Sequence, residues 1–140
     1  MITFDADIAS ELIFGNFDVV NRATAIPGEE QSLPIVVVEE ILRGRLSVIR
    51  SAESGKGRTA IDQAYELLQQ SITFIREFPI LPYTDAAEQL FQTWRIQKIR
   101  IGTHDLRISA VAVAHGATLV SRNRTDFDLV PNLHVEYWGR

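Results

Sequence analysis

Cysteine is absent from the 140 residues of this chain. Its absence excludes disulfide bonds and metal sites built from thiolates. No apolar run approaches the roughly 20 residues that a membrane-spanning helix needs. Acidic Asp5 and Asp7 stand where a secretion signal would carry basic residues followed by an apolar stretch. We therefore expect a cytoplasmic protein that neither enters a membrane nor is secreted.

Lysine is also scarce, because only Lys56 and Lys98 accompany the arginines among 14 basic residues. The net charge of −4 argues against a strongly basic nucleic-acid coat protein. It does not exclude an enzyme that holds nucleic acid locally, since arginine makes bidentate contacts with phosphate. With 46% hydrophobic residues, the chain has the composition of an ordinary globular protein, and we expect one domain over residues 1–140.

Short apolar segments alternate with longer segments of helical periodicity along the chain. The expected strands are residues 2–5, 32–38, 78–81, 117–121 and 134–138. The expected helices cover residues 6–24 as one or two helices, about 38–51, 59–76, a segment capped by Thr84, and a segment from Asp105 to Gly116. Strands that alternate with helices predict an α/β fold, with a mostly parallel sheet covered on both faces.

Four acidic residues stand at or shortly after the ends of apolar runs. They are Asp5, Glu40, Asp105 and Asp126. In an open parallel sheet, functional side chains collect at the carboxyl ends of the strands. Several carboxylates cannot share a site without a counter-charge, because like charges at close range repel. We therefore predict that these four side chains bind Mg²⁺ or Mn²⁺, cations that prefer oxygen ligands.

Other polar residues near these acids have simpler interpretations. Asp7 is interpreted as the N-cap of the first helix, or as a residue that supports Asp5. Glu39 cannot face the same site as Glu40, because adjacent helical residues point about 100° apart, so we expect Glu39 in solvent. His104 is expected to lie on the surface, since Mg²⁺ does not favour imidazole ligands.

The segment after the fourth apolar run carries a dense set of polar groups. Ser121 and Asn123 precede Asp126, and Arg122 and Arg124 lie between them. We expect residues 123–127 to form a loop in which Ser121 and Asn123 shape the pocket. The two arginines are expected to reach the phosphates of a substrate, and Phe127 to anchor the loop in the core.

Three stretches together resemble the PIN-domain nucleases, in particular the small VapC-type toxins of toxin–antitoxin pairs. Residues 2–7 resemble the opening strand of that family, which ends in Asp-Thr-Asn. Residues 37–44 resemble its Glu-Leu-x-x-Gly segment and align Glu40 with the acidic residue of the family. Residues 103–127 resemble its C-terminal block in order and spacing, whereas residues 52–100 match only in pattern.

The resemblance implies a three-layer α/β/α sandwich around a parallel sheet of about five strands. It implies hydrolysis of phosphodiester bonds in single-stranded RNA by one or two Mg²⁺ or Mn²⁺ ions held by the four acids. It also implies a small antitoxin partner and a homodimer, for which Ile8, Leu12, Ile13 and Phe14 are a candidate contact surface. Ala6 and Asp7 depart from the family pattern, and residues 15–31 form a longer segment than in compact members.

Three other classes of protein fit the sequence less well. Asp5 and Asp7 form the Asp-x-Asp pattern of haloacid-dehalogenase phosphatases, but Ala9 stands where those enzymes have Thr or Val. The alternative prediction is a non-catalytic RNA-binding or protein-interaction module on the same fold. The presence of all four carboxylates favours the nuclease, and no glycine-rich fingerprint supports a nucleotide sensor.

Overall fold

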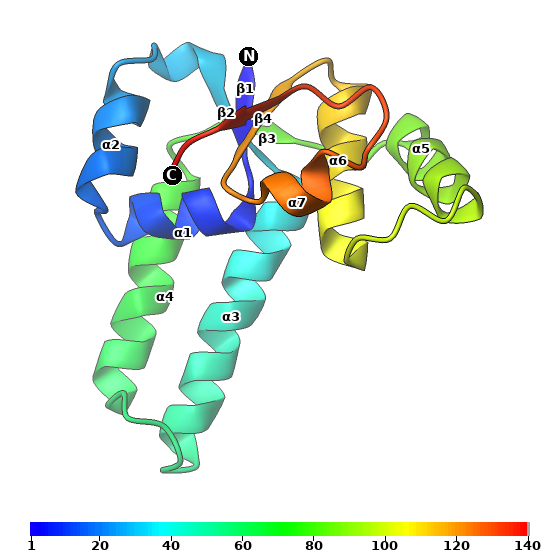
Figure 1. The fold of residues 1–140 in the computed structure, drawn as a ribbon. Helices are drawn as coiled ribbons and strands as arrows, with labels where there is room; N and C mark the ends of the chain where they lie inside the picture. Colours follow the sequence, from blue (N-terminus) through cyan, green and yellow to red (C-terminus); the bar gives the residue numbers. More distant parts are fainter. Residues whose placement is uncertain (140) are drawn as a thin grey trace.

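The computed structural model describes residues 1–139, which fold into five strands and seven α-helices (Figure 1). Their order along the chain is β1 (Ile2–Phe4), α1 (Ala6–Ile13), α2 (Phe17–Thr24), β2 (Gln31–Pro34), α3 (Ile35–Glu53), α4 (Ile61–Ile75), β3 (Ile80–Leu81), α5 (Asp85–Ile96), α6 (Thr103–Ala114), β4 (Thr118–Ser121), α7 (Arg124–Phe127) and β5 (Val135–Tyr137). A short 3-10 helix, η1 (Gly28–Glu30), precedes β2. None of the helices in the described part of the chain is long and apolar enough to cross a membrane.

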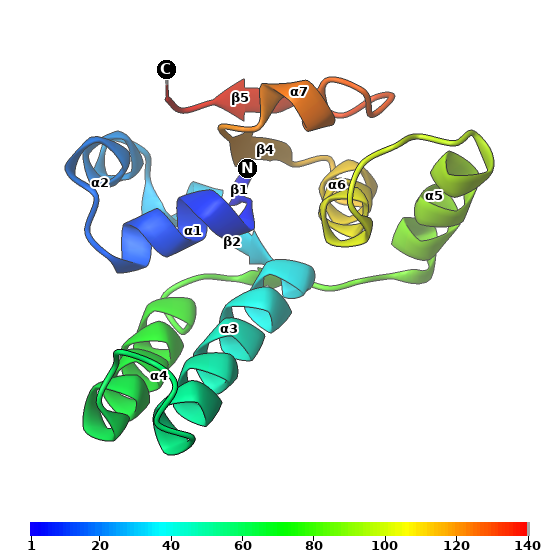
Figure 2. The ribbon, with the colours of Figure 1, turned by 60° about the horizontal axis from the view of Figure 1, so that its bottom comes forward.

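All strand pairs of the sheet are parallel, in the order β3-β2-β1-β4-β5. Ile2 pairs with Gln31 on one side and with Thr118 on the other, so β1 is the central strand. Helices α1 and α2 lie on one side of the sheet, and α5 and α6 lie on the other (Figure 2). The predicted α/β/α sandwich with a parallel sheet is confirmed, and β3, which follows Pro79, lies at an edge of the sheet.

The strand order reverses direction at the centre of the sheet, which places a topological switch point at the carboxyl ends of β1 and β4. From β1 the chain progresses to β2 and β3 on one side, and it then crosses to β4 and β5 on the other. In open α/β sheets, ligands bind at such a switch point. This topology therefore singles out the residues that follow Phe4 and Ser121.

The core is formed where the central strands meet the helices on both faces. Phe4, Leu33 and Leu119 have no exposed surface, and Phe127 is buried as expected for an anchor. Of the candidate partner surface on α1, Ile8 is wholly buried and Leu12 and Ile13 pack against the core, whereas Phe14 is 65% exposed. Most of this apolar set therefore stabilises the fold.

Two expected element boundaries were wrong. The second strand was predicted over residues 32–38, but β2 ends at Pro34 and α3 begins at Ile35. The β-branched residues Val36, Val37 and Val38 are buried in the first turns of α3. Their burial against the core outweighs their modest preference for strands. Residues 124–127, predicted as a loop, form the single-turn helix α7.

Helix α5 begins at a side-chain cap that the sequence predicted. The Thr84 hydroxyl accepts a hydrogen bond from the Ala87 N–H at 3.2 Å. We expect Thr84→Ala to lower the free energy of unfolding by about 1 kcal/mol and the melting temperature by roughly 3–5 °C. Thr73→Ala, at an exposed position in the last turn of α4, is the control and should cause no loss, because alanine favours helix. Equal melting temperatures for the Thr84 variant and the wild type would contradict the cap.

Candidate active site

Four helices begin close together below the carboxyl ends of the strands. Figure 1 shows the first turns of α1, α3, α6 and α7 converging at this edge of the sheet. Each contributes one predicted acid, because Asp5 precedes α1, Glu40 lies in the second turn of α3, and Asp105 and Asp126 lie in the first turns of α6 and α7. The partial positive charges of the helix N-termini favour anionic groups here.

Asp5 is fixed at the switch point by its own backbone and side chain. Its N–H donates to the Val120 carbonyl at 3.1 Å, which joins the ends of β1 and β4. Its Oδ1 accepts a hydrogen bond from the Ile8 N–H at 2.9 Å and caps α1. Only 3% of Asp5 is exposed. Burial raises the pKa of the Asp5 carboxyl to about 6, although hydrogen bonds from Ser121 and Ile8 oppose the shift.

Asp7 has a different place from the one predicted. The N-cap of α1 is Asp5, and Asp7 lies exposed within the first turn. The extended backbone of Asp5, at ψ 175°, is the conformation that an N-cap requires. The Asp7 charge nevertheless contributes to the raised pKa of Asp5, Glu40 and Asp105. Asp7 therefore faces the same space as these three acids.

Glu40 directs one oxygen into a buried position that lacks a hydrogen-bond partner. Among residues 1–139, its Oε1 is one of few buried side-chain atoms without one. Burial raises the pKa of Glu40, with Asp105 acting in the same direction and His104 opposing it. Glu39 is exposed as expected, and it pairs with Arg43 and with His104, whose Nε2 lies 3.4 Å from Oε1 of Glu39. A buried acceptor without a donor is costly unless a ligand satisfies it.

Asp105 and Asp126 join Asp5 and Glu40 to form the acidic face of the site. Burial raises the pKa of Asp105, and the charges of Asp126 and Asp7 add to this effect. Asp126 is held by Asn123, whose Nδ2 donates to Oδ2 of Asp126 at 3.0 Å and whose Oδ1 accepts the Asp126 N–H at 3.2 Å. The Ser121 hydroxyl accepts the Asn123 N–H at 2.9 Å. Ser121 and Asn123 thus orient the acids of β1 and α7.

The structure ties both predicted phosphate-binding arginines to neighbouring groups. Arg122 pairs with Oε1 of Glu11 at 2.5 Å and donates to the Trp138 carbonyl at 2.9 Å. The guanidinium of Arg124 lies 4.1 Å from the centre of the Tyr137 ring. Arg122 therefore holds α1 and the C-terminal segment against β4. Sequence reasoning missed Glu11 and Trp138, because no local pattern links positions so far apart in the chain.

The four carboxylates face one space without forming a closed ligand set. Within residues 1–139, no three His, Cys, Asp or Glu side chains stand close enough to hold a metal ion as placed. Their mutual influence on pKa shows that they are near enough to repel. The donors are all oxygens, and one is buried without a partner. These properties fit a hard divalent cation, which would remove the repulsion.

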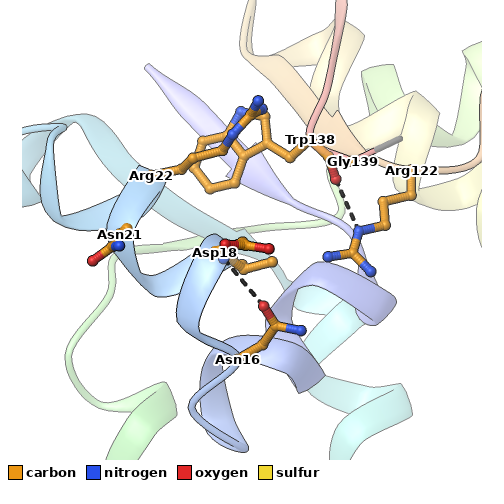
Figure 3. A pocket seen from close by; sticks show the side chains of 8 residues that line it. Asn16, Asp18, Asn21, Arg22, Arg122, Trp138 and Gly139 are labelled. Carbon is orange, nitrogen blue, oxygen red and sulfur yellow. Dashed lines mark hydrogen bonds between the residues drawn. The ribbon is translucent and has the colours of Figure 1, made fainter.

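A hollow of about 760 Å³ is lined by none of the four predicted acids (Figure 3). Its wall is formed by α2, by Arg122 and by the C-terminal residues Trp138 and Gly139. The Arg22 guanidinium lies 6.0 Å from the centre of the Trp138 ring. Neither Arg22 nor Trp138 was predicted as a functional residue.

The fold defined by this sheet and these helices is PIN-like, as the motifs predicted. No family model matches the chain. Over 64 residues the chain is 39% identical to Ribonuclease VapC1 of Rickettsia felis, a stretch that covers 41% of this chain and 46% of that protein. The matched stretch thus spans less than half of that relative.

Solved structures resemble the chain over nearly its whole length. One is VapBC2 from Rickettsia felis bound to a DNA fragment from their promoter, with a TM-score of 0.75 and 22% identity over 99% of this chain and 100% of that one. Another is a toxin–antitoxin complex from Klebsiella pneumoniae, with a TM-score of 0.70 and 20% identity over 95% of each chain. The resemblance to VapC-type toxins is therefore confirmed, in sequence over part of the chain and in fold over nearly all of it.

Proposed function

We propose that this protein is a metal-dependent endoribonuclease that hydrolyses phosphodiester bonds in single-stranded RNA. The proposal is supported by the positions of four acids at or near the starts of α1, α3, α6 and α7, and by a buried Glu40 oxygen that lacks a partner. The partial sequence match to a protein named a ribonuclease supports the same activity. The rival interpretation, a non-catalytic RNA-binding or protein-interaction module, would not require this concentration of unneutralised acids.

In this proposal Asp5, Glu40, Asp105 and Asp126 hold Mg²⁺ or Mn²⁺. A bound cation lowers the pKa of a water molecule and stabilises charge on the scissile phosphate and the leaving oxygen. The buried oxygens of Asp5 and Glu40 provide ligands that water reaches poorly. The acidic face repels bare RNA, so the cation also contributes to substrate binding.

The remaining polar residues of the site position these ligands. Ser121 hydrogen-bonds toward Asp5 and accepts from the Asn123 backbone, and Asn123 holds Asp126. These contacts restrict two of the four carboxylates to the switch point before any ion binds. In this proposal Arg122 and Arg124 contact the phosphates of the RNA at the edge of the site. They either leave their present partners, Glu11 and Tyr137, or bind phosphate while these contacts persist.

The proposal includes a protein partner. Solved structures with this fold are described as toxin–antitoxin complexes, one of them bound to promoter DNA. We infer that a small antitoxin blocks this site, and that the chain forms a homodimer. Phe14, exposed at the end of α1, is the member of the predicted apolar surface that is available for such contacts.

The activity is tested with purified protein and a labelled single-stranded RNA. We expect cleavage with Mg²⁺ or Mn²⁺, no cleavage in chelator, and recovery when the ion is added back in excess. Asp105→Asn protein prepared in parallel is the control for contaminating ribonuclease and should be inactive. Equal cleavage by both proteins, or cleavage in chelator, would contradict the proposal. Binding of RNA without cleavage would favour the non-catalytic module.

A further inference from the structure

One residue of the hollow's wall, Trp138, packs against the strand that precedes Asp5. The Trp138 ring packs edge-on against Phe4 at 5.6 Å between ring centres, and Phe4 directly precedes Asp5. The backbone N–H of Trp138 donates to the Ser121 carbonyl at 2.9 Å, and Arg122 follows Ser121. One side of the hollow is therefore rigidly joined to the residues that position Asp5.

The opposite side of the hollow is formed by α2, which occupies the segment that the sequence showed to be longer than in compact relatives. Helix α2 contributes Asp18, Asn21 and Arg22 to the lining, and its N-cap Asn16 stands at the edge. The Asn16 side chain accepts a hydrogen bond from the Val19 N–H at 3.3 Å through its oxygen, so its amide nitrogen is turned outward as a donor. This wall therefore offers side-chain donors and one carboxylate acceptor.

Of the two arginines that line this hollow, Arg22 is the one available to bind a ligand. None of the ion pairs formed within residues 1–139 involves Arg22, whereas Arg122 is paired with Glu11. Arg22 is exposed, while the Trp138 ring beneath it is 2% exposed. The buried ring thus lies near the guanidinium, at the outer limit of a cation–π contact, and the exposed guanidinium is accessible to a ligand. An exposed guanidinium plane is a surface on which RNA bases stack.

We propose that this hollow, here called the Arg22–Trp138 pocket, receives a nucleotide of the RNA strand next to the bond that is cut. The base stacks on the exposed Arg22 guanidinium, and Asn16 and Asp18 face its edge. The volume of about 760 Å³ lies in the range of small-molecule sites and accommodates a nucleotide. The inference rests on the proposed ribonuclease function and adds a residue that determines how RNA is bound.

The pocket is tested by the kinetics of cleavage of a short labelled oligoribonucleotide in Mn²⁺. We expect Arg22→Ala to raise KM about tenfold and to leave kcat within twofold, since stacking on one base is worth a factor of this size. Arg22→Lys keeps the charge without the planar group and should recover less than half of the lost affinity on a logarithmic scale. Arg95→Ala is the matched control, because Arg95 is also exposed and lies 5.6 Å from an aromatic ring, that of Phe91, on α5.

The outcomes separate the pocket from the nuclease. A tenfold rise in KM for Arg22→Ala, with no change for Arg95→Ala, supports the pocket. Three outcomes would contradict the pocket without contradicting the nuclease. They are an unchanged KM in Arg22→Ala, full recovery of affinity in Arg22→Lys, and equal losses of affinity in the Arg22 and Arg95 alanine variants. If the wild type binds the RNA without cutting it, the RNA affinities of the same variants, measured by fluorescence anisotropy, test the pocket independently of cleavage. Protein that neither binds nor cuts RNA overturns both.

Discussion

Asp5→Asn is expected to lower kcat for RNA cleavage about a thousandfold, since loss of a cation ligand removes several kcal/mol of transition-state stabilisation. Asparagine keeps the side-chain oxygen that caps α1 through the Ile8 N–H, so the fold should survive. The change removes only the charge at the point where β1 and β4 meet. Loss of activity would therefore report on the site and not on the stability of the protein.

The matched control for this experiment is Asp85→Asn. Asp85 also lies in the first turn of a helix, α5, but it is exposed and accepts a hydrogen bond from Gln89. Its substitution removes the same charge from the protein and should change kcat by less than twofold. Single-turnover cleavage in Mn²⁺ measures the three proteins together. An Asp5→Asn variant with more than a tenth of wild-type activity would show that Asp5 does not carry the chemistry.

The same substitution is expected to stabilise the metal-free protein at pH 7.5 by roughly 3 kcal/mol, the equivalent of the raised pKa of Asp5. The folded-state pKa of about 6 lies above the unfolded value of 3.8, so folding favours the protonated acid. Well below pH 3.8 both states are protonated and the penalty vanishes. As pH rises the penalty develops, and it is complete above the folded-state pKa. Asparagine has no ionisable carboxyl, so the variant does not incur this penalty.

Urea unfolding in chelator from pH 4 to 8 measures this difference. The advantage of Asp5→Asn should be small at pH 4, about a fifth of its full size, and reach its full size above pH 7. The wild type should itself lose stability over this range, because the pKa of Glu40 and Asp105 is also raised. Saturating Mn²⁺ should reduce this advantage, because the ion stabilises the wild type more than the variant that binds it more weakly. A variant less stable than the wild type at pH 7.5 without metal would mean that the Asp5 charge is compensated inside the protein.

Local signals in the sequence were sufficient for much of the fold. Pro79 lacks a backbone donor, which favours an edge position for the strand that follows it. The structure places β3 at an edge of the sheet. Thr84 caps α5, and Gly116, at φ +64°, ends α6 in the left-handed conformation that glycine tolerates. Asp5, Glu40, Asp105 and Asp126 were predicted from their places after apolar runs. The parallel topology then gathers their helix starts at one edge.

Features that depend on packing between distant segments were not predictable in this way. The three valines at the start of α3 favour strand locally, and only their burial against the core explains the helix. Asp5 and Asp7 are equally good caps by residue type, and the end of β1 decides for Asp5. The pairing of Arg122 with Glu11 and the approach of Arg22 to Trp138 join positions more than 100 residues apart.

Calorimetric titration of Mn²⁺ into the metal-free protein at pH 6.5 tests the central claim, that these carboxylates form a cation site. We expect saturable binding accompanied by proton release, measured as a dependence of the heat on the ionisation enthalpy of the buffer, because acids of raised pKa must lose protons to bind the ion. Asp5→Asn should weaken binding at least tenfold, and Asp85→Asn should leave it unchanged. Equal binding by wild type and Asp5→Asn, or no saturable binding by the wild type, would contradict the account.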